Sequence, residues 1–214
     1  MRARRHLVKL HKATRKRLVC LKLLAGEASR ALQGQDRAVA FVTIELLSTW
    51  ANFVRSYYLS CWLSPVSLTG RKISLRKPMG SSLGPLGYAI TKWRPRERPN
   101  ATGTWDRRRE PTWHDPKTLL VLASDLRFTN LQDIQEGLSG HTRAFIDLPV
   151  QRNFFAHRGH ETFRAAMDNL RIQHGVVGAL SPSGGLVCPL PGRPQALLGD
   201  WIDDISLTAE YLCM

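Results

Sequence analysis

Arginine, asparagine and histidine occur together in one short stretch of this chain. Residues 152–157 read Arg-Asn-Phe-Phe-Ala-His. On a helix, Asn153 and His157 would lie one turn apart on a shared face, with Arg152 at its edge. An imidazole, whose pKa is near ~6.5, can transfer a proton at neutral pH, and a guanidinium binds phosphate through a fixed fork of donors. We therefore interpret Arg152, Asn153 and His157 as candidate catalytic residues for phosphodiester cleavage. The alternative interpretation is a structural hydrogen-bonded pair.

Such a site would act on RNA without a metal or another cofactor. The 2′-hydroxyl beside the scissile phosphate is the nucleophile, so the protein needs to supply only proton transfer and charge stabilisation. Arg152 would stabilise charge on the phosphate, His157 would transfer the proton, and Asn153 would orient the imidazole or hold a phosphate oxygen. His160 and Glu161 follow closely, but their spacing matches no established zinc pattern, and His160 is expected to cap the next helix.

The motif lies in a region of helical periodicity. Apolar residues three or four apart predict helices within 117–138 and 142–171, the second broken near Pro149 and Gly159. Pro149 is expected in a first helical turn, where its missing N–H costs nothing. Phe154 and Phe155 would then point into the core and hold the motif rigid.

A long amphipathic helix is predicted upstream, over residues 36–63. Asp36 is expected to cap its start, and Ser64-Pro65 is expected to end it. The polar side of this helix carries Glu45 and Asn52, two turns apart. These two residues either face solvent, which is the usual arrangement, or line the same cleft behind the catalytic residues.

Helices are also predicted near both ends of the sequence. Residues 5–32 place Leu7, Leu10, Thr14, Leu18, Leu21 and Leu24 on one stripe, with basic residues largely off it. This segment is a helix lying on a phosphate backbone, a bundle helix with a solvated face, or a mitochondrial presequence. Residues 196–212 form another apolar stripe, and 175–194 are predicted to be a loop or small hairpin around 183–185. The outline is an all-α fold of five or six helices.

Residues 66–116 interrupt this pattern. They contain six prolines, and no helical stripe is visible in them. Residues 73–75 and 88–91 could be short strands. The glycine-rich run 80–87 lacks the Lys-Ser/Thr ending of a phosphate-binding loop, so an ordinary loop is predicted there. We interpret 66–116 as an irregular insertion, rich in proline, glycine and arginine, within a single helical domain that spans residues 1–214.

The positive charge of the chain is concentrated in two regions. The formal net charge is +14, of which residues 1–30 carry +9 and residues 66–116 carry +7, while residues 117–214 carry −2. A surface this basic attracts polyanions, of which nucleic acids are the commonest. The candidate RNA-binding residues are Arg94, Arg96, Arg98, Arg107, Arg108, Arg109 and Arg158. Three nearby tryptophans either stack on bases of single-stranded RNA or anchor the insertion to the bundle: Trp93, Trp105 and Trp113.

Composition narrows the remaining choices. With 214 residues and 43% hydrophobic residues, the chain can bury a core, so wholesale disorder is not expected. It contains no run of eighteen apolar residues, so no membrane span is expected. The four cysteines are scattered without a Cys-x-x-Cys pair, which fits a reducing cytoplasm better than a disulfide scaffold.

Residues 152–157 resemble the signature of the HEPN superfamily, in which four to six residues, usually beginning with a polar one, separate an arginine from a histidine. Here Asn153 takes the polar place and four residues separate Arg152 from His157. The resemblance implies an all-α bundle and a metal-independent ribonuclease of the toxin–antitoxin, abortive-infection or phage-defence type. It also implies a homodimer that joins two Arg/His sets in one cleft, and an antitoxin or other defence partner protein. The tyrosine that nucleotide-modified relatives carry two positions after the histidine is replaced here by Gly159.

Two other functions remain open on the residues alone. A non-catalytic nucleic-acid-binding module would use the same basic surface, with the Arg/His site vestigial or structural. A peripheral membrane protein would dock through residues 1–24. The first alternative predicts salt-sensitive binding without cleavage.

Overall fold

The chain is helical throughout the part that we can describe. A computed structural model describes residues 7–30, 35–76, 83–140, 142–189, 192 and 195–214. These residues form nine α-helices and one 3-10 helix, and their only β-structure is two isolated bridges, Val66 to Lys72 and Pro189 to Ala196. The all-α prediction is confirmed. The helix number was underestimated, because two short helices, Gly84–Trp93 and Pro182–Val187, lie in regions rich in glycine or proline, and the predicted segment 117–138 forms two helices.

Three long helices form the base of the fold. They are α1 (Leu7–Arg30), α2 (Gln35–Cys61) and α9 (Leu197–Cys213), and α1 packs against both of the others. In the predicted apolar stripe of α1, Leu7, Thr14, Leu18 and Leu21 are buried and Leu10 is half-buried. Leu24 is 39% exposed, because the buried face moves to Ala25 and Ala28. The bundle-helix interpretation of this segment is therefore confirmed.

The core of the base is rich in aromatic side chains. Trp50, Phe53, Tyr57 and Tyr58 of α2 and Trp201 of α9 are almost fully buried. Each large side chain removed from water stabilises the fold by about 1.5–3 kcal/mol. Such a core makes α2 a rigid platform for the segments above it.

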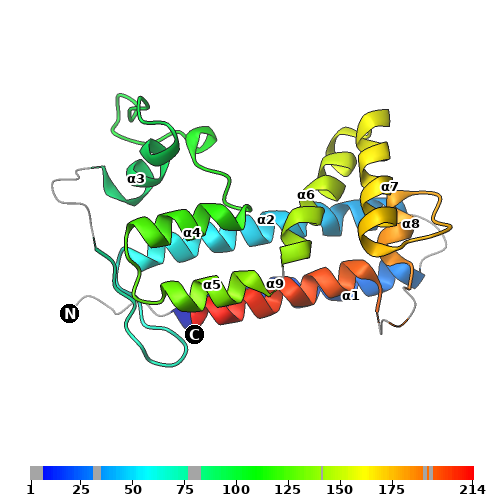
Figure 1. The fold of residues 1–214 in the computed structure, drawn as a ribbon, viewed down its shortest axis with the longest axis horizontal. Coiled ribbons are helices and arrows are strands. Elements are labelled where there is room, and N and C mark those ends of the chain that lie inside the picture. The colour runs from blue at the N-terminus through cyan, green and yellow to red at the C-terminus, as the bar shows by residue number, and fades with distance from the viewer. Residues whose placement is uncertain (1–6, 31–34, 77–82, 141, 190–191, 193–194) are drawn as a thin grey trace.

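The remaining helices stand on this base or lie along it. They are α3 (Gly84–Trp93), α4 (Pro116–Asp125), α5 (Leu131–Ser139), α6 (Thr142–His157), α7 (His160–His174) and α8 (Pro182–Val187). Figure 1 shows α6 and α7 rising from one end of the base and the insertion with α3 rising from the other. Helix α6 contacts α2, α7 and α9.

The insertion is more regular than predicted. Residues 88–91 lie in α3 and are not a strand, and residues 73–75 form no ladder. Pro85 occupies the first turn of α3, where proline is favoured, so it starts a helix and does not end one. Residues 107–109 form the 3-10 helix η1, capped by the side chain of Asp106. Part of the predicted glycine-rich loop, residues 80–82, lies outside the described residues.

The segment predicted to be a loop or hairpin contains α8. The Ser181 hydroxyl accepts a hydrogen bond from the Gly184 N–H (3.1 Å), and Pro182 occupies the first helical turn. The Ser-Pro pair is thus a helix start, and this signal outweighs the two glycines that suggested a turn. The hairpin prediction was wrong.

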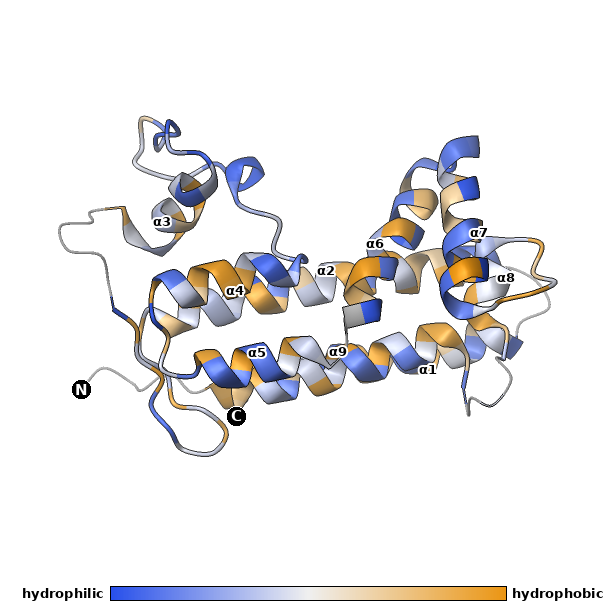
Figure 2. Cartoon of the chain, viewed as in Figure 1, coloured by the Kyte–Doolittle hydropathy of each residue, from blue (hydrophilic) through white to orange (hydrophobic). Residues whose placement is uncertain are grey.

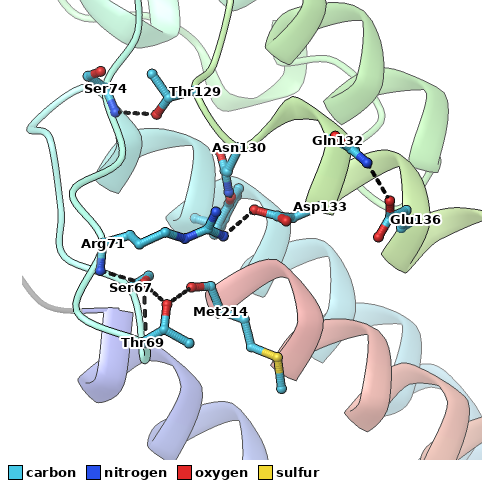
Figure 3. Close-up of polar contacts among 11 residues, drawn as sticks. Ser67, Thr69, Arg71, Ser74, Thr129, Asn130, Gln132, Asp133, Glu136 and Met214 are labelled. Carbon is cyan, nitrogen blue, oxygen red and sulfur yellow. Dashed lines mark hydrogen bonds and ion pairs between the residues drawn. The ribbon is translucent and has the colours of Figure 1, made fainter.

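A loop between α2 and α3 ties the base together at one end. Figure 3 shows Arg71 pairing with Asp133 of α5, and Thr69 donating to the Met214 carbonyl (2.6 Å). Ser74 N–H donates to the Thr129 hydroxyl (3.0 Å). Across the described residues, no helix is long and apolar enough to cross a membrane.

Candidate active site

The candidate motif lies in the second half of α6. This helix begins at Thr142, so Pro149 lies inside it. The prediction that Pro149 occupies a first helical turn was wrong. Proline has no N–H to donate to the carbonyl of Phe145, four residues earlier. The helix nevertheless continues, because Ala144, Phe145 and Leu148 are buried in the core and hold it there.

The last turn of α6 is fixed by two phenylalanines. Phe154 and Phe155 are 8% and 5% exposed, as predicted, and the Phe154 ring packs edge-on to Phe163 of α7 with centroids 5.8 Å apart. Arg152, Asn153 and His157 point the other way and are exposed. The sequence pattern therefore correctly separated the buried face from the exposed one.

A buried polar cluster locks α6 to α7. The Asp147 carboxylate is 2.8 Å from His174 Nε2 and accepts from Asn169 Nδ2 (2.7 Å). Gln151 Nε2 donates to Asn169 Oδ1 (3.0 Å) and to the Ala166 carbonyl (2.9 Å). These bonds fix the rotation of α6, and with it the direction of Arg152, the residue next to Gln151.

An ion pair stabilises the turn that follows the motif. Arg158 has a positive φ of 48°, and its guanidinium pairs with Asp36 of α2 (2.7 Å). Asp36 also accepts from Ser183, and this bond, with the contribution of Arg158, lowers the pKa of its carboxyl. Asp36 was predicted to cap α2, but it lies in the first turn of that helix. Its side chain joins α2 to Arg158, after α6, and to Ser183 of α8. Arg158, a predicted RNA-binding residue, is engaged in this ion pair.

Helix α7 starts directly after the turn. Its N-cap is Gly159, whose N–H donates to the Thr162 hydroxyl (3.0 Å). The same hydroxyl donates to the Gly159 carbonyl (2.9 Å). His160 is the first residue of the helix, and the cap comes from Thr162. The prediction that His160 caps this helix was wrong.

An open pocket of about 790 Å³ lies beside the motif. Its floor is α2 around Ser48, and its walls are α6 and α7. Arg152, Asn153, Glu161 of α7 and His114 line it. His157 is not part of the lining, and lies one helical turn beyond Asn153, about 6 Å away along the same face. The structure thus brings Arg152 and Asn153 into one pocket and leaves His157 outside its lining.

The two candidate residues on α2 lie elsewhere. Glu45 pairs with Arg17 of α1, and Asn52 accepts a hydrogen bond from Arg107 (3.2 Å). Neither lines the pocket. Ala51, which precedes Asn52 in the sequence, does line it, whereas Arg107 does not.

His114 is the site residue that the sequence did not reveal. It lies in the segment between η1 and α4, and its carbonyl accepts from Trp50 Nε1 (3.1 Å). Burial lowers the pKa of its imidazole, Asp115 opposes this, and Arg152 adds to the lowering. No local pattern could have indicated His114, because its partners lie in three other elements.

The insertion presents its arginines unequally. Arg109 pairs with Glu97 (3.2 Å), and Arg98 donates to nearby carbonyl groups. Three side chains are exposed and bind no other described residue: Arg94, Arg96 and Arg108. Figure 2 shows hydrophilic residues around η1 and at the outer ends of α6 and α7.

The tryptophans of the insertion serve mainly as anchors. Trp113 is 7% exposed, donates to Glu110 (2.7 Å) and packs on Tyr58 with ring centroids 5.3 Å apart. Trp105 lies against Gly87 of α3. Only Trp93, at 43% exposure, is open to a base.

Comparisons with known proteins do not assign this chain to a family. No protein-family model, curated protein or solved structure matches it. Its function must therefore be inferred from the side chains themselves.

The pocket lining combines one guanidinium, one amide and one imidazole with a single carboxylate, that of Glu161. Among the described residues, no cluster of three or more His, Cys, Asp or Glu side chains could hold a metal ion. The Arg152 guanidinium forms no hydrogen bond or ion pair with any described residue, and the same holds for the His157 imidazole. Both groups are therefore available to a ligand.

Proposed function

We propose that this chain is a metal-independent endoribonuclease of the HEPN type. One observation carries the proposal: Arg152 and His157 are exposed on a rigid helical turn, unbound by other described side chains, beside an open pocket. Polar groups used only for stability are normally hydrogen-bonded inside the protein, as Asp147 and His174 are here.

The three side chains would divide the work on a scissile phosphate. Arg152 would bind the non-bridging oxygens and stabilise the charge that develops on them. Asn153, in the same pocket, would hold a phosphate oxygen or orient the imidazole. His157 would transfer a proton at neutral pH. A pocket of about 790 Å³ is large enough for one nucleotide and its flanking phosphates.

The charge of the chain supports an RNA substrate. Its net charge of +14 attracts a polyanion, and Arg107 binds Asn52 of α2, the helix that also supplies Ser48 and Ala51 to the pocket. The exposed arginines of the insertion would hold RNA on the side of the pocket away from α7. The HEPN resemblance further suggests a homodimer, an antitoxin or other defence partner, and a role as a toxin or phage-defence effector.

The test is cleavage of RNA in the presence of EDTA. We expect the purified chain to leave 2′,3′-cyclic phosphate and 5′-hydroxyl ends. His157→Ala should cleave about 10²–10⁴-fold more slowly, because it lacks a group that transfers a proton. Arg152→Ala should be impaired as well. His160→Ala is a matched control, because His160 is an exposed histidine outside the pocket lining.

Three results would contradict this function or its assignment to these residues. Cleavage abolished by EDTA would point to a metal-dependent enzyme. Binding of RNA by the wild type without any cleavage would favour the second candidate, a nucleic-acid-binding module with an inactive site. Equal cleavage by the wild type and a folded His157→Ala variant would assign the activity to other residues.

A further inference from the structure

A histidine outside the 152–157 motif lines the pocket that holds Arg152 and Asn153. His114 lies far from the motif in the sequence and enters the pocket from the segment that links the insertion to α4. RNA cleavage by the 2′-hydroxyl needs two proton transfers, one from the nucleophile and one to the leaving oxygen. A single imidazole cannot readily perform both at once.

We infer that His114 is the general base of the proposed reaction and that His157 is its general acid, an assignment that rests on the ribonuclease function proposed above. His114 lines the pocket together with Arg152 and Asn153, and His157 follows Asn153 by one helical turn, outside the lining. A scissile phosphate bound to Arg152 would thus lie in the same pocket as the His114 imidazole, and His157 would reach it from the next turn of α6.

The backbone around His114 is firmly held. Trp50 donates to the His114 carbonyl (3.1 Å), and the preceding residue, Trp113, is buried against Tyr58. On the other side, the Asp115 side chain caps α4 by accepting from the Lys117 N–H (2.9 Å). These contacts hold the backbone of His114 in place. Its imidazole is only half-buried and lines the pocket, so a ligand can reach it.

The charges around His114 favour a neutral imidazole. Burial and the positive Arg152 on α6 lower its pKa, while Asp115 in its own segment opposes them. Glu161 of α7 also lines the pocket, and the α2 residues that face it, Leu47, Ser48 and Ala51, are uncharged. A lowered pKa leaves the imidazole unprotonated at neutral pH, as a general base requires.

The reaction then balances without another reagent. Neutral His114 takes the proton of the 2′-hydroxyl as the 2′-oxygen bonds to phosphorus. The bond from phosphorus to the 5′-oxygen breaks, and protonated His157 gives its proton to that oxygen. The products are a 2′,3′-cyclic phosphate and a 5′-hydroxyl, and the two histidines exchange protons with water before the next turnover.

The test compares pH–rate profiles of RNA cleavage for the wild type, His114→Ala and His157→Ala, with His160→Ala as control. We expect His114→Ala to lower kcat about 10²–10⁴-fold and to lose the acidic limb of the profile. Its affinity for a non-cleavable 2′-deoxy oligonucleotide should stay within about threefold of wild type, since Arg152 remains. The fold should survive, because any residue at position 114 keeps the carbonyl that Trp50 binds.

The outcomes are distinct. If wild type cleaves, His157→Ala is inactive and His114→Ala retains the wild-type rate and acidic limb, the inference fails while the proposed function stands. That result would assign the base to His157 of a second copy. If His114→Ala loses rate only in step with a loss of thermal stability, and His114→Asn restores both, His114 is structural and the inference is wrong. Absence of cleavage by the wild type overturns both proposals.

Discussion

Single side chains around α6 fall into two groups with opposite surroundings. Asp147 and His174, 1% and 4% exposed as side chains, are sealed in a polar cluster between α6 and α7. Arg152 and His157, a few residues away, are exposed and pair with no other residue that the structure describes. The buried group holds the helix in place, and the exposed group is left for a ligand.

The buried cluster makes the first prediction. His174→Ala should lower the free energy of unfolding by about 3–5 kcal/mol, because it leaves the Asp147 carboxylate buried with one partner fewer. Lys22→Ala is the control, since Lys22 pairs with Asp203 on the surface, where such pairs contribute about 0–1 kcal/mol. Urea unfolding at pH 7 measures both. Equal effects of the two substitutions would contradict a stabilising role for the cluster.

Two histidines predict how stability depends on pH. In the folded chain, the pKa values of His11 and His114 lie below the ordinary histidine value of 6.5, and burial is the main cause. Below pH 6.5 the unfolded chain therefore binds more protons, so stability should fall as the pH is lowered from about 7 to 5. The double variant His11→Gln/His114→Gln should show a shallower fall over this range in urea unfolding. An unchanged slope would show that other groups cause it.

The sequence was informative about the motif and silent about its surroundings. The spacing within 152–157 correctly predicted buried Phe154 and Phe155 and an exposed opposite face. It could not predict His114, which reaches the pocket only through tertiary contacts, such as the bond from Trp50 to its carbonyl. Local periodicity reports which face of a helix is buried, and not which distant segment covers the other face.

At the scale of elements, the long helices were predictable and the short ones were not. The stripes of α1, α2 and α9 extend over several turns, so their burial follows from spacing alone. Helices α3 and α8 have ten and six residues, and each has a proline in its first turn that was interpreted as a helix breaker. The error at Pro149 was the opposite one. Pro149 was expected to start a helix, but α6 begins seven residues earlier and continues past it, because its apolar residues are buried in the core.

Helix α3 makes a prediction about how the insertion is anchored. A Cβ on Gly87 would lie 2.7 Å from Trp105 Cζ2 and 2.8 Å from Leu83 Cβ, both closer than atoms pack. Gly87→Ala should therefore destabilise the chain by about 1–3 kcal/mol. It should also expose the arginines of residues 94–109 to trypsin, which limited proteolysis would detect.

The matched control for Gly87 is another helical glycine. A Cβ on Gly26 of α1 meets nothing within 4 Å, so Gly26→Ala should stabilise the chain by about 0.5–1 kcal/mol through the gain in helix propensity. Opposite signs for the two substitutions would support the contact between α3 and Trp105. Stabilisation by both would show that Trp105 moves aside without cost.

At the scale of the whole molecule, positive charge and candidate site are arranged around one platform. Helix α2 forms the floor of the pocket, with α6 and α7 at one end and the insertion toward the other (Figure 1). Helix α1 is basic, as the insertion is, but it packs on α2 and α9 and contributes no residue to the pocket. If the chain binds RNA along the pocket, the two basic regions should contribute unequally.

Salt dependence can separate the two regions. The triple variant Arg94→Ala/Arg96→Ala/Arg108→Ala removes three exposed, unpaired charges from the insertion. In a His157→Ala background, which should bind RNA without cleaving it, this variant should reduce the slope of log affinity against log salt by about 2 for single-stranded RNA. The triple variant Lys12→Ala/Arg15→Ala/Lys16→Ala removes the same charge from exposed positions on α1 and should leave the slope nearly unchanged. Equal reductions would mean that RNA is attracted by net charge alone, and a larger effect of the α1 variant would place the RNA on the opposite face from the pocket.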